Sequence, residues 1–250
     1  LTEDVNLAGE QLEEISFGAT FDGKGYAITG LKGQLFNVLT GTIKNVALFD
    51  CIRLYNEGII AYQTGEGNLI ENVFISMTDA GKQYSGVFRQ INVDVNFKNV
   101  IIVAKTNRDN LDHGYVSGIS FPNRKIINDN CYFIVENEDF LPVGLRSGSS
   151  FVENETDSKA MLSGNYKQYN TVDEFKLDTQ KTLSSELTNL YNKYSLDSEA
   201  IAISSVEDFE KIPANSAKEY YLTTDIDFEL ATSPLSTVNF AGTLDGRGYA

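Results

Sequence analysis

The sequence predicts an all-β fold, a right-handed parallel β-helix (solenoid) with a small helical cap or spacer. Two periodic series predict it. An asparagine recurs among short apolar segments at nearly equal spacing, at Asn45, Asn72, Asn99 and Asn130. A glycine precedes these segments at a similar spacing, at Gly33, Gly58, Gly86 and Gly118. Units of this size, each with short strands, are typical of coils that stack at the strand spacing of about 4.8 Å.

The strands within each unit follow from alternation of apolar residues. Val46 and Leu48 share one face with each other, as do the corresponding residues of the next two units. An asparagine tolerates the left-handed turn conformation, and its amide can bond the coils above and below. We therefore expect Asn45, Asn72 and Asn99 to form one ladder within residues 17–135. A leucine-rich horseshoe would need a tight leucine spacing, and an immunoglobulin sandwich would not give collinear glycine and asparagine series.

A longer repeat joins the two ends of the chain. Residues 17–27, FGATFDGKGYA, and residues 240–250, FAGTLDGRGYA, are identical at seven of eleven positions. Residues 1–7, LTEDVNL, match residues 222–228, LTTDIDF. The two blocks are offset by almost the same amount, which predicts a tandem period near 222 in which each period is a whole module. We expect this chain to be a window on a longer array.

The expected organisation has three parts: coils over 1–140, a loop and helical cap or spacer over 141–200, and the start of the next module over 201–250. Thr171 and Glu174 form a capping box ahead of an apolar residue. One apolar face of a following helix is predicted from Leu183, Leu187, Leu190, Tyr191 and Tyr194. Laid over the open end of the coils, this helix would cover unpaired strand edges; a partner-binding helix is the alternative.

Unpaired strand edges are also expected in 201–250. They predict head-to-tail contact with an adjacent module or a second copy.

Composition excludes several classes of protein. The chain has 20 Lys and Arg against 35 Asp and Glu, a net charge of −15, which disfavours nucleic acid as a partner. No apolar run approaches the roughly 20 residues of a membrane span. Cys51 and Cys131 lie among apolar residues and are interpreted as two buried thiols, a single disulfide being the alternative. One histidine and two isolated cysteines cannot supply the four ligands of a zinc site.

No catalytic residues are predicted. A polysaccharide lyase or hydrolase on this fold needs carboxylates stacked at one outward position of adjacent coils, and the turns after the asparagines carry no consistent acidic column. The best acidic cluster is Asp109 and Asp112 near His113, interpreted as a solvated turn. No cofactor is predicted. A Ca²⁺ ion is the alternative at Asp225 and Asp227, and at Asp4 in the first copy, where strand-end solvation is the simpler interpretation.

The two Asp-Gly pairs, Asp22-Gly23 and Asp245-Gly246, are interpreted as turns between strands. The aspartate can bond its own backbone, and glycine accepts positive φ. A phosphate-binding loop is the alternative, but no Ser or Thr follows the lysine or arginine as a P-loop requires.

The entry block LTTDIDF…STVNFAGTLDGRGYA, continued in the first copy by ITGL at 28–31, resembles that of bacterial surface modules with GLUG-type coils. Residues 58–75, GIIAYQTGEGNLIENVFI, are similar to one such coil. The chain departs from the pattern at Ala61 and Arg89, which replace a glycine, and no Trp precedes either Phe-x-Gly element. The resemblance implies a secreted or wall-anchored, adhesin-like protein at the bacterial cell surface.

The expected function is therefore a non-enzymatic extracellular surface module, a stalk, fibre or adhesin that presents a β-helix for adhesion or assembly. Its expected partners are adjacent modules and a glycan or other cell-surface ligand. The alternative is a carbohydrate-binding or polysaccharide-degrading module. Thirteen Tyr and fifteen Phe leave scope for an exposed aromatic platform that would bind sugar.

Overall fold

The computed structural model divides the chain into two compact units, residues 1–194 and residues 195–250. Each unit is described by itself. The described residues are 1–13, 15–49, 51, 56–78, 84–105, 114–135, 140–148, 150–195, 201–212, 216, 218–227, 240 and 242–246.

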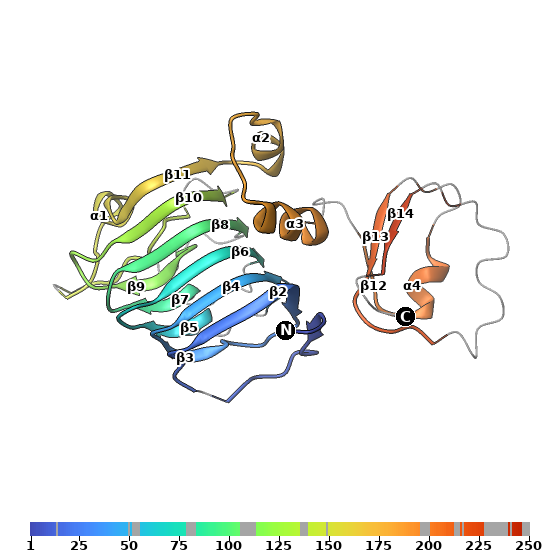
Figure 1. Ribbon diagram of the computed structural model, residues 1–250, viewed down its shortest axis with the longest axis horizontal. Coiled ribbons are helices and arrows are strands. Elements are labelled where there is room, and N and C mark those ends of the chain that lie inside the picture. The colour runs from blue at the N-terminus through green and yellow to red at the C-terminus, as the bar shows by residue number, and fades with distance from the viewer. Residues whose placement is uncertain are drawn as a thin grey trace. The chain divides into compact units, whose positions relative to one another are not determined.

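Two parallel sheets form the first unit (Figure 1). The larger sheet contains, in spatial order, β1 (Val5–Asn6), β2 (Thr20–Thr29), β4 (Thr42–Phe49), β6 (Leu69–Thr78), β8 (Val95–Lys105), β10 (Ile126–Val135) and β11 (Leu162–Tyr169). The smaller sheet contains β3 (Phe36–Leu39), β5 (Gly58–Thr64), β7 (Gly86–Ile91) and β9 (Ser117–Ser120). From β2 to β10 the chain alternates between the sheets, and each strand pairs in parallel with the one added before it. The prediction of a mostly β fold of stacked parallel strands, a solenoid-like architecture, is confirmed.

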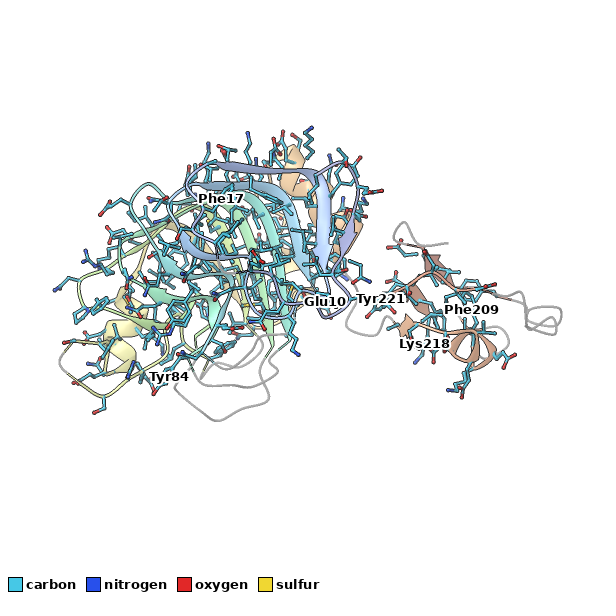
Figure 2. The ribbon with its side chains drawn as sticks, turned by 90° about the horizontal axis from the view of Figure 1, so that it is seen from below. Glu10, Phe17, Tyr84, Phe209, Lys218 and Tyr221 are labelled. Carbon is cyan, nitrogen blue, oxygen red and sulfur yellow. The ribbon has the colours of Figure 1, made fainter. Side chains whose placement is uncertain are left out.

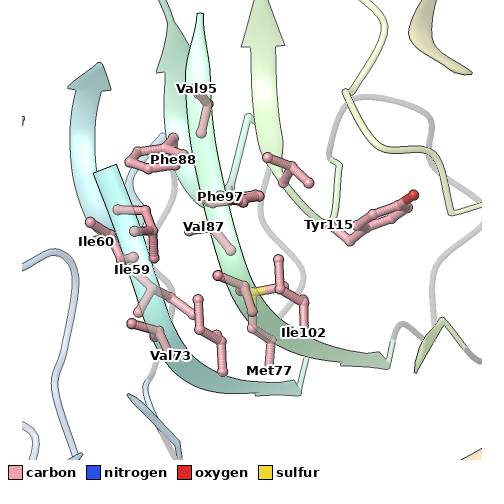
Figure 3. Packing of buried hydrophobic residues seen from close by; sticks show 14 of the residues in the cluster. Ile59, Ile60, Val73, Met77, Val87, Phe88, Val95, Phe97, Ile102 and Tyr115 are labelled. Carbon is pink, nitrogen blue, oxygen red and sulfur yellow. The ribbon is translucent and has the colours of Figure 1, made fainter. Parts of the chain in front are cut away.

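The core lies between the two sheets, where inward side chains of equivalent positions stack in columns. Val46, Val73 and Val100 are paired in register across β4, β6 and β8 and are fully buried. Phe88 of the smaller sheet packs on Phe97 of the larger sheet, with ring centroids 6.3 Å apart (Figure 3). Full burial of one such side chain stabilises the fold by roughly 1.5–3 kcal/mol, which explains why the apolar alternation recurs in every unit.

The two cysteines contribute to this core as small apolar residues. Cys51 and Cys131 are both buried thiols that are not joined in a disulfide, as the sequence predicts. Burial raises the pKa of Cys131 to about 12, because the thiolate would have to form away from water.

The position of the helices corrects one expectation. The structure places α3 (Ser185–Tyr194) across the outward face of the larger sheet, against β2, β4, β6 and β8, and not over an open end of the stack. Its apolar face, with Leu187 and Tyr191, covers Ala47, Phe74 and Ile101. These outward residues are apolar where a solvated sheet face would be polar, so the face needs a cover.

The segment before that helix also differs from the expected cap. Residues Leu162–Tyr169 form β11, which extends the larger sheet beyond β10, between α1 (Glu155–Ala160) and α2 (Val172–Leu177). The capping residue is confirmed, since the Thr171 Oγ1 accepts a hydrogen bond from the Glu174 amide at 3.1 Å.

In its described residues, the second unit consists of a small parallel sheet and one short helix. The strands β12 (Ile201–Ile203), β13 (Glu219–Leu222) and β14 (Thr243–Asp245) pair in this order. The helix α4 (Val206–Glu210) begins after Ser205, whose side chain accepts from the Asp208 amide. Ile203, Phe209 and Tyr220 are among the buried residues that hold helix and sheet together. Among the described residues of either unit, no helix has the length and apolarity needed to cross a membrane.

Candidate functional site: the asparagine ladder

The four periodic asparagines lie in one hydrogen-bonded ladder on the larger sheet. Each side-chain amide donates from Nδ2 to the Oδ1 of the preceding coil: Asn72 to Asn45 at 3.1 Å, Asn99 to Asn72 at 3.0 Å, and Asn130 to Asn99 at 2.9 Å. The ladder begins one coil earlier than the series in the sequence, because the Asn45 Nδ2 donates to the Asp22 Oδ1 at 3.0 Å.

The backbone explains why asparagine is used at these positions. Asn45, Asn72, Asn99 and Asn130 all have positive φ, between 51° and 59°, the left-handed conformation that most side chains avoid. Each residue makes a local bend inside its strand without breaking the pairing of the residues on either side. In the coils of β4, β6, β8 and β10, one asparagine therefore both adopts the positive φ of the bend and bonds its side-chain amide to the preceding coil.

The first coil makes the corresponding bend with a different sequence, Asp22-Gly23-Lys24-Gly25. The pairing of β2 with β4 shifts between Asp22 and Tyr26, so that residues 23–25 stand opposite Asn45 alone. Asp22 Oδ1 accepts from the Lys24 amide at 2.9 Å, and Lys24 has a φ of 52°. The predicted Asp-Gly turn is thus a bulge within one strand, where a Cβ on Gly23 would lie 2.5 Å from the Cβ of Val46. In the second copy, Asp245 ends β14 and Gly246 follows it.

A column of alternating charge runs beside the ladder. The residues that precede the ladder positions are paired in register in the order Asp22, Lys44, Glu71, Lys98 and Asp129. Lys98 Nζ lies 2.8 Å from the Glu71 Oε1, and this hydrogen bond raises the pKa of Lys98. Exposed ion pairs contribute little stability, but like charges at stacked positions would repel, so the alternation favours this register over a slipped one. This alternation of charge was not predicted, although it is visible in the sequence as the charged residue before each asparagine.

Burial and hydrogen bonding act in opposite directions on the aspartate that begins the ladder. Burial raises the pKa of Asp22, but the bonds from the Lys24 amide and Asn45, together with the charge of Lys44, outweigh it and leave the pKa below its usual value. Asp22 is therefore held as a carboxylate, an acceptor only.

The segment that leads into α3 is attached to this ladder. Ser184 Oγ donates to the Asn72 Oδ1 at 2.9 Å, and Asn130 Nδ2 donates to the carbonyl of Thr182 at 2.6 Å. The Thr182 amide in turn donates to the Tyr132 hydroxyl at 2.9 Å. The ladder thus fixes where α3 starts, and the helix then covers the apolar strip of the sheet.

The glycine series is only partly a column. Gly58 and Gly86 are direct partners in β5 and β7, and Gly33, with a φ of 93°, precedes β3. Gly118 was wrongly grouped with them, because Phe88 pairs with Ser117 and Gly118 therefore lies beside Arg89. Gly114 takes the expected place one coil after Gly86, and a Cβ on Gly86 would lie 2.5 Å from its carbonyl oxygen.

The Ca²⁺ candidates do not form a cluster. The carboxylate of Asp4 accepts from the Ala27 amide at 2.8 Å and from the Tyr194 hydroxyl, and it lies 3.3 Å from Lys193 Nζ. Asp225 and Asp227 follow β13 in the other unit. Within the described ranges, no three His, Cys, Asp or Glu side chains gather as a metal site would require. Asp109, Asp112 and His113 lie outside the described residues.

The ladder suits a structural role, because its four amides and one carboxylate bond one another from coil to coil. Comparison of the chain with models of protein families, with curated proteins and with solved structures returned no match. Function therefore has to be argued from the residues of this chain.

Replacing Asn72 by alanine is expected to lower the free energy of unfolding by about 2–3 kcal/mol. About 1–2 kcal/mol comes from the amide bonds to Asn45, Asn99 and Ser184, and the rest from alanine at positive φ. Asn72→Gly, which accepts this φ, should lose only the first part, and the exposed Asn192→Ala should change little. Urea unfolding measures all three; equal stability of Asn72→Ala and Asn192→Ala would contradict the ladder's role.

Proposed function

We propose that this chain is a non-enzymatic extracellular module of a bacterial surface protein, one repeat of a tandem array that serves as a stalk, fibre or adhesin. The observation that carries the proposal is the correspondence between the two units. Thr243–Asp245, equivalent to Thr20–Asp22, pair with β13, whose last residue Leu222 is equivalent to Leu1. In the first unit, the amino group of Leu1 donates to the carbonyl of Asp22 at 2.8 Å.

The two copies are therefore built alike around the Asp-Gly block. Leu1 lies beside Asp22, and the residue before Leu222, Tyr221, pairs with Asp245. This likeness supports the interpretation that 201–250 starts a second stack of coils. We propose that the stack is a right-handed parallel β-helix, since parallel crossovers within one sheet are right-handed in nearly all proteins.

The surface of the first unit supports a structural role over a catalytic one. In the described residues, the charged side chains of β2, β4, β6 and β8 that precede or begin the ladder pair with one another along a column. A glycosidase or lyase needs carboxylates that converge on one bond. The resemblance to GLUG-type modules supports the surface location and the head-to-tail partner.

The array is tested by completing the second copy. The experiment uses a fusion protein in which residues 28–194 are joined directly after Ala250. This junction completes the second copy, because Ala250 is equivalent to Ala27. We expect the amides of β13 and β14 to become strongly protected from hydrogen exchange, since new coils would pair with them. The matched control omits Ile28 at the junction, which shifts the register by one residue and turns the apolar side chains outward. Protection that is equal in both chains, or no greater than in 1–250 alone, would overturn the proposal.

Carbohydrate binding is a second candidate function, and a group of aromatic side chains on or near the smaller sheet favours it. Tyr62, Tyr84 and Phe151 are half-buried, each against the guanidinium of an arginine. Rings of this kind bind the apolar faces of sugars. The degrading version of this candidate has no such support.

A further inference from the structure

Three aromatic rings and two arginines form a cluster outside the core, here called the arginine–aromatic cluster: Tyr62, Tyr84, Arg89, Arg146 and Phe151. The Arg89 guanidinium lies over the Tyr62 ring, 4.6 Å from its centroid. Arg146 lies over two rings, 5.1 Å from the Tyr84 centroid and 4.6 Å from the Phe151 centroid. Stacking of this kind covers the faces of a guanidinium and leaves its in-plane N–H donors open to a ligand.

The smaller sheet positions the cluster. Ala61 pairs with Phe88, whose side chain points into the core, so their neighbours Tyr62 and Arg89 stand together on the outward face. Phe88 also pairs with Ser117, which places Gly118, a residue without a side chain, next to Arg89. The register thus places Tyr62 and Arg89 side by side on strands, and Tyr84, Arg146 and Phe151 reach the same surface from outside the strands.

The two positive charges of the cluster have no acidic partner in the described part of the chain. Arg89 donates from Nε to the Asn56 Oδ1 at 2.8 Å and bonds the Gln90 side chain, both of which are neutral amides. Burial lowers the pKa of Arg89, and the neighbouring charge of Arg146 lowers it further. Although the protein has a net charge of −15, these two arginines are bonded to neutral amides and rings and to no carboxylate of the described residues, and their geometry favours a planar anion brought by a ligand.

Two further features lie at the same place. Tyr84 has a φ of 56°, a left-handed conformation that costs energy for an aromatic residue, and Figure 2 shows it at the periphery of its unit. Strain of this kind gathers at ligand-binding sites. Phe151, which Arg146 covers, also lines a cavity of about 310 Å³ together with Arg124 and Lys125. Of the three arginines that the structure describes, Arg89 and Arg146 belong to the cluster, and Arg124 lines the cavity that Phe151 shares.

We propose that the arginine–aromatic cluster binds a carboxylated saccharide, an oligomer of uronic acid residues. The carboxylates would accept paired hydrogen bonds from Arg89 and Arg146, and the sugar rings would pack on the tyrosines. The amides of Asn56 and Gln90 are close enough to Arg89 to meet hydroxyl groups. An acidic peptide would satisfy the arginines but would not use the aromatic faces, so the saccharide is favoured. This inference adds a ligand to the proposed surface module and does not depend on the array.

The test is calorimetric titration of the whole chain with hexamers of galacturonate, of mannuronate and of hyaluronan, and with neutral maltohexaose. We expect at least one uronate hexamer to bind and the neutral hexamer not to bind. Arg146→Gln should weaken binding at least tenfold, whereas Lys218→Gln, which removes the same charge from the other unit, should not. Failure of all three uronate hexamers to bind at millimolar concentration, or equal binding by both variants, would overturn the proposal.

A second pair of variants separates binding from folding. Tyr84→Gly relieves the positive φ but removes the ring, so the melting temperature should stay equal or rise while uronate binding weakens. Tyr84→Phe should retain both. A purely structural tyrosine would give the opposite result for Tyr84→Gly, a lower melting temperature with unchanged binding. Tighter binding of heparin hexamer or of polyglutamate than of any uronate would show sulfate or peptide to be the ligand and overturn the saccharide assignment. The fusion that tests the array is unaffected by any of these outcomes.

Discussion

Replacing Phe175 by alanine is expected to lower the free energy of unfolding of the first unit by about 3–5 kcal/mol, the range for deleting a fully buried phenylalanine. Phe175 is fully buried, and its ring contacts three tyrosines from different elements, Tyr132, Tyr169 and Tyr191, at centroid distances of 5.7, 5.4 and 5.0 Å. Loss of this ring opens a cavity at the point where α2, α3 and the larger sheet meet.

Urea unfolding followed by circular dichroism measures this effect, and the near-ultraviolet signal of the tyrosines reports the same cluster. The matched control is Leu177→Ala in the same helix, because Leu177 is 79% exposed and its loss should change stability by less than about 0.5 kcal/mol. A cost below about 1 kcal/mol for Phe175→Ala would mean that the helices do not pack on the sheet as described.

Replacing Gly58 by alanine is expected to cost about 3 kcal/mol, at the upper end of the range for overpacking. A Cβ at this position would lie 2.3 Å from the Ala61 carbonyl oxygen, 2.5 Å from the Arg89 nitrogen and 2.7 Å from the Phe88 carbonyl carbon. Carbon contacts are optimal near roughly 3.5–4.0 Å, and all three atoms belong to backbone, so β5 must change its own bend at Ala61 and also separate from β7.

Gly18→Ala is the control for that experiment. A Cβ on Gly18 meets one atom closely, the Thr40 Oγ1 at 2.9 Å, and this hydroxyl can rotate away. We expect thermal unfolding of Gly18→Ala to stay close to that of the unaltered protein, while Gly58→Ala melts well below it. Similar melting of the two variants would show that β5 and β7 can separate at little cost.

The parts of the fold that the sequence predicts are those that depend on local backbone preference. An asparagine at positive φ followed by apolar residues recurs in four successive coils, so β4, β6, β8 and β10 could be predicted. The capping residue Thr171 and the apolar face of α3 are local as well. The strand β11 was missed, although Gly164 followed by Asn165 and Tyr166 resembles the asparagine element of the earlier coils.

What could not be predicted depends on register and on which surfaces meet. The apolar face of α3 shows that the helix is covered, but not that Ala47, Phe74 and Ile101 cover it. Arg89 and Arg146 lie far apart in the sequence, and only the stacking of coils and the closing loop bring their guanidinium groups to neighbouring rings.

The hydrogen bonds of the asparagine ladder all run in one direction, from Asn130 down to Asp22. The amide dipoles therefore point the same way, and each bond polarises the next. An asparagine can pass the bond on, because it both donates and accepts, whereas a carboxylate can only accept. Asp22 is thus where a chain of donors must end.

The carboxylate of Asp22, which is paired in register with Lys44 and not with an asparagine, therefore distinguishes the first coil from the four following coils that carry the asparagines. Each asparagine side chain both accepts and donates, so it extends the ladder by one coil, whereas the aspartate only accepts and forms the first member of the ladder. Asp245 occupies the equivalent position in the second copy, so the aspartate that begins the ladder recurs after one full period. The sequence therefore specifies at which coil the ladder begins, and the stack has a defined polarity from its first coil onward.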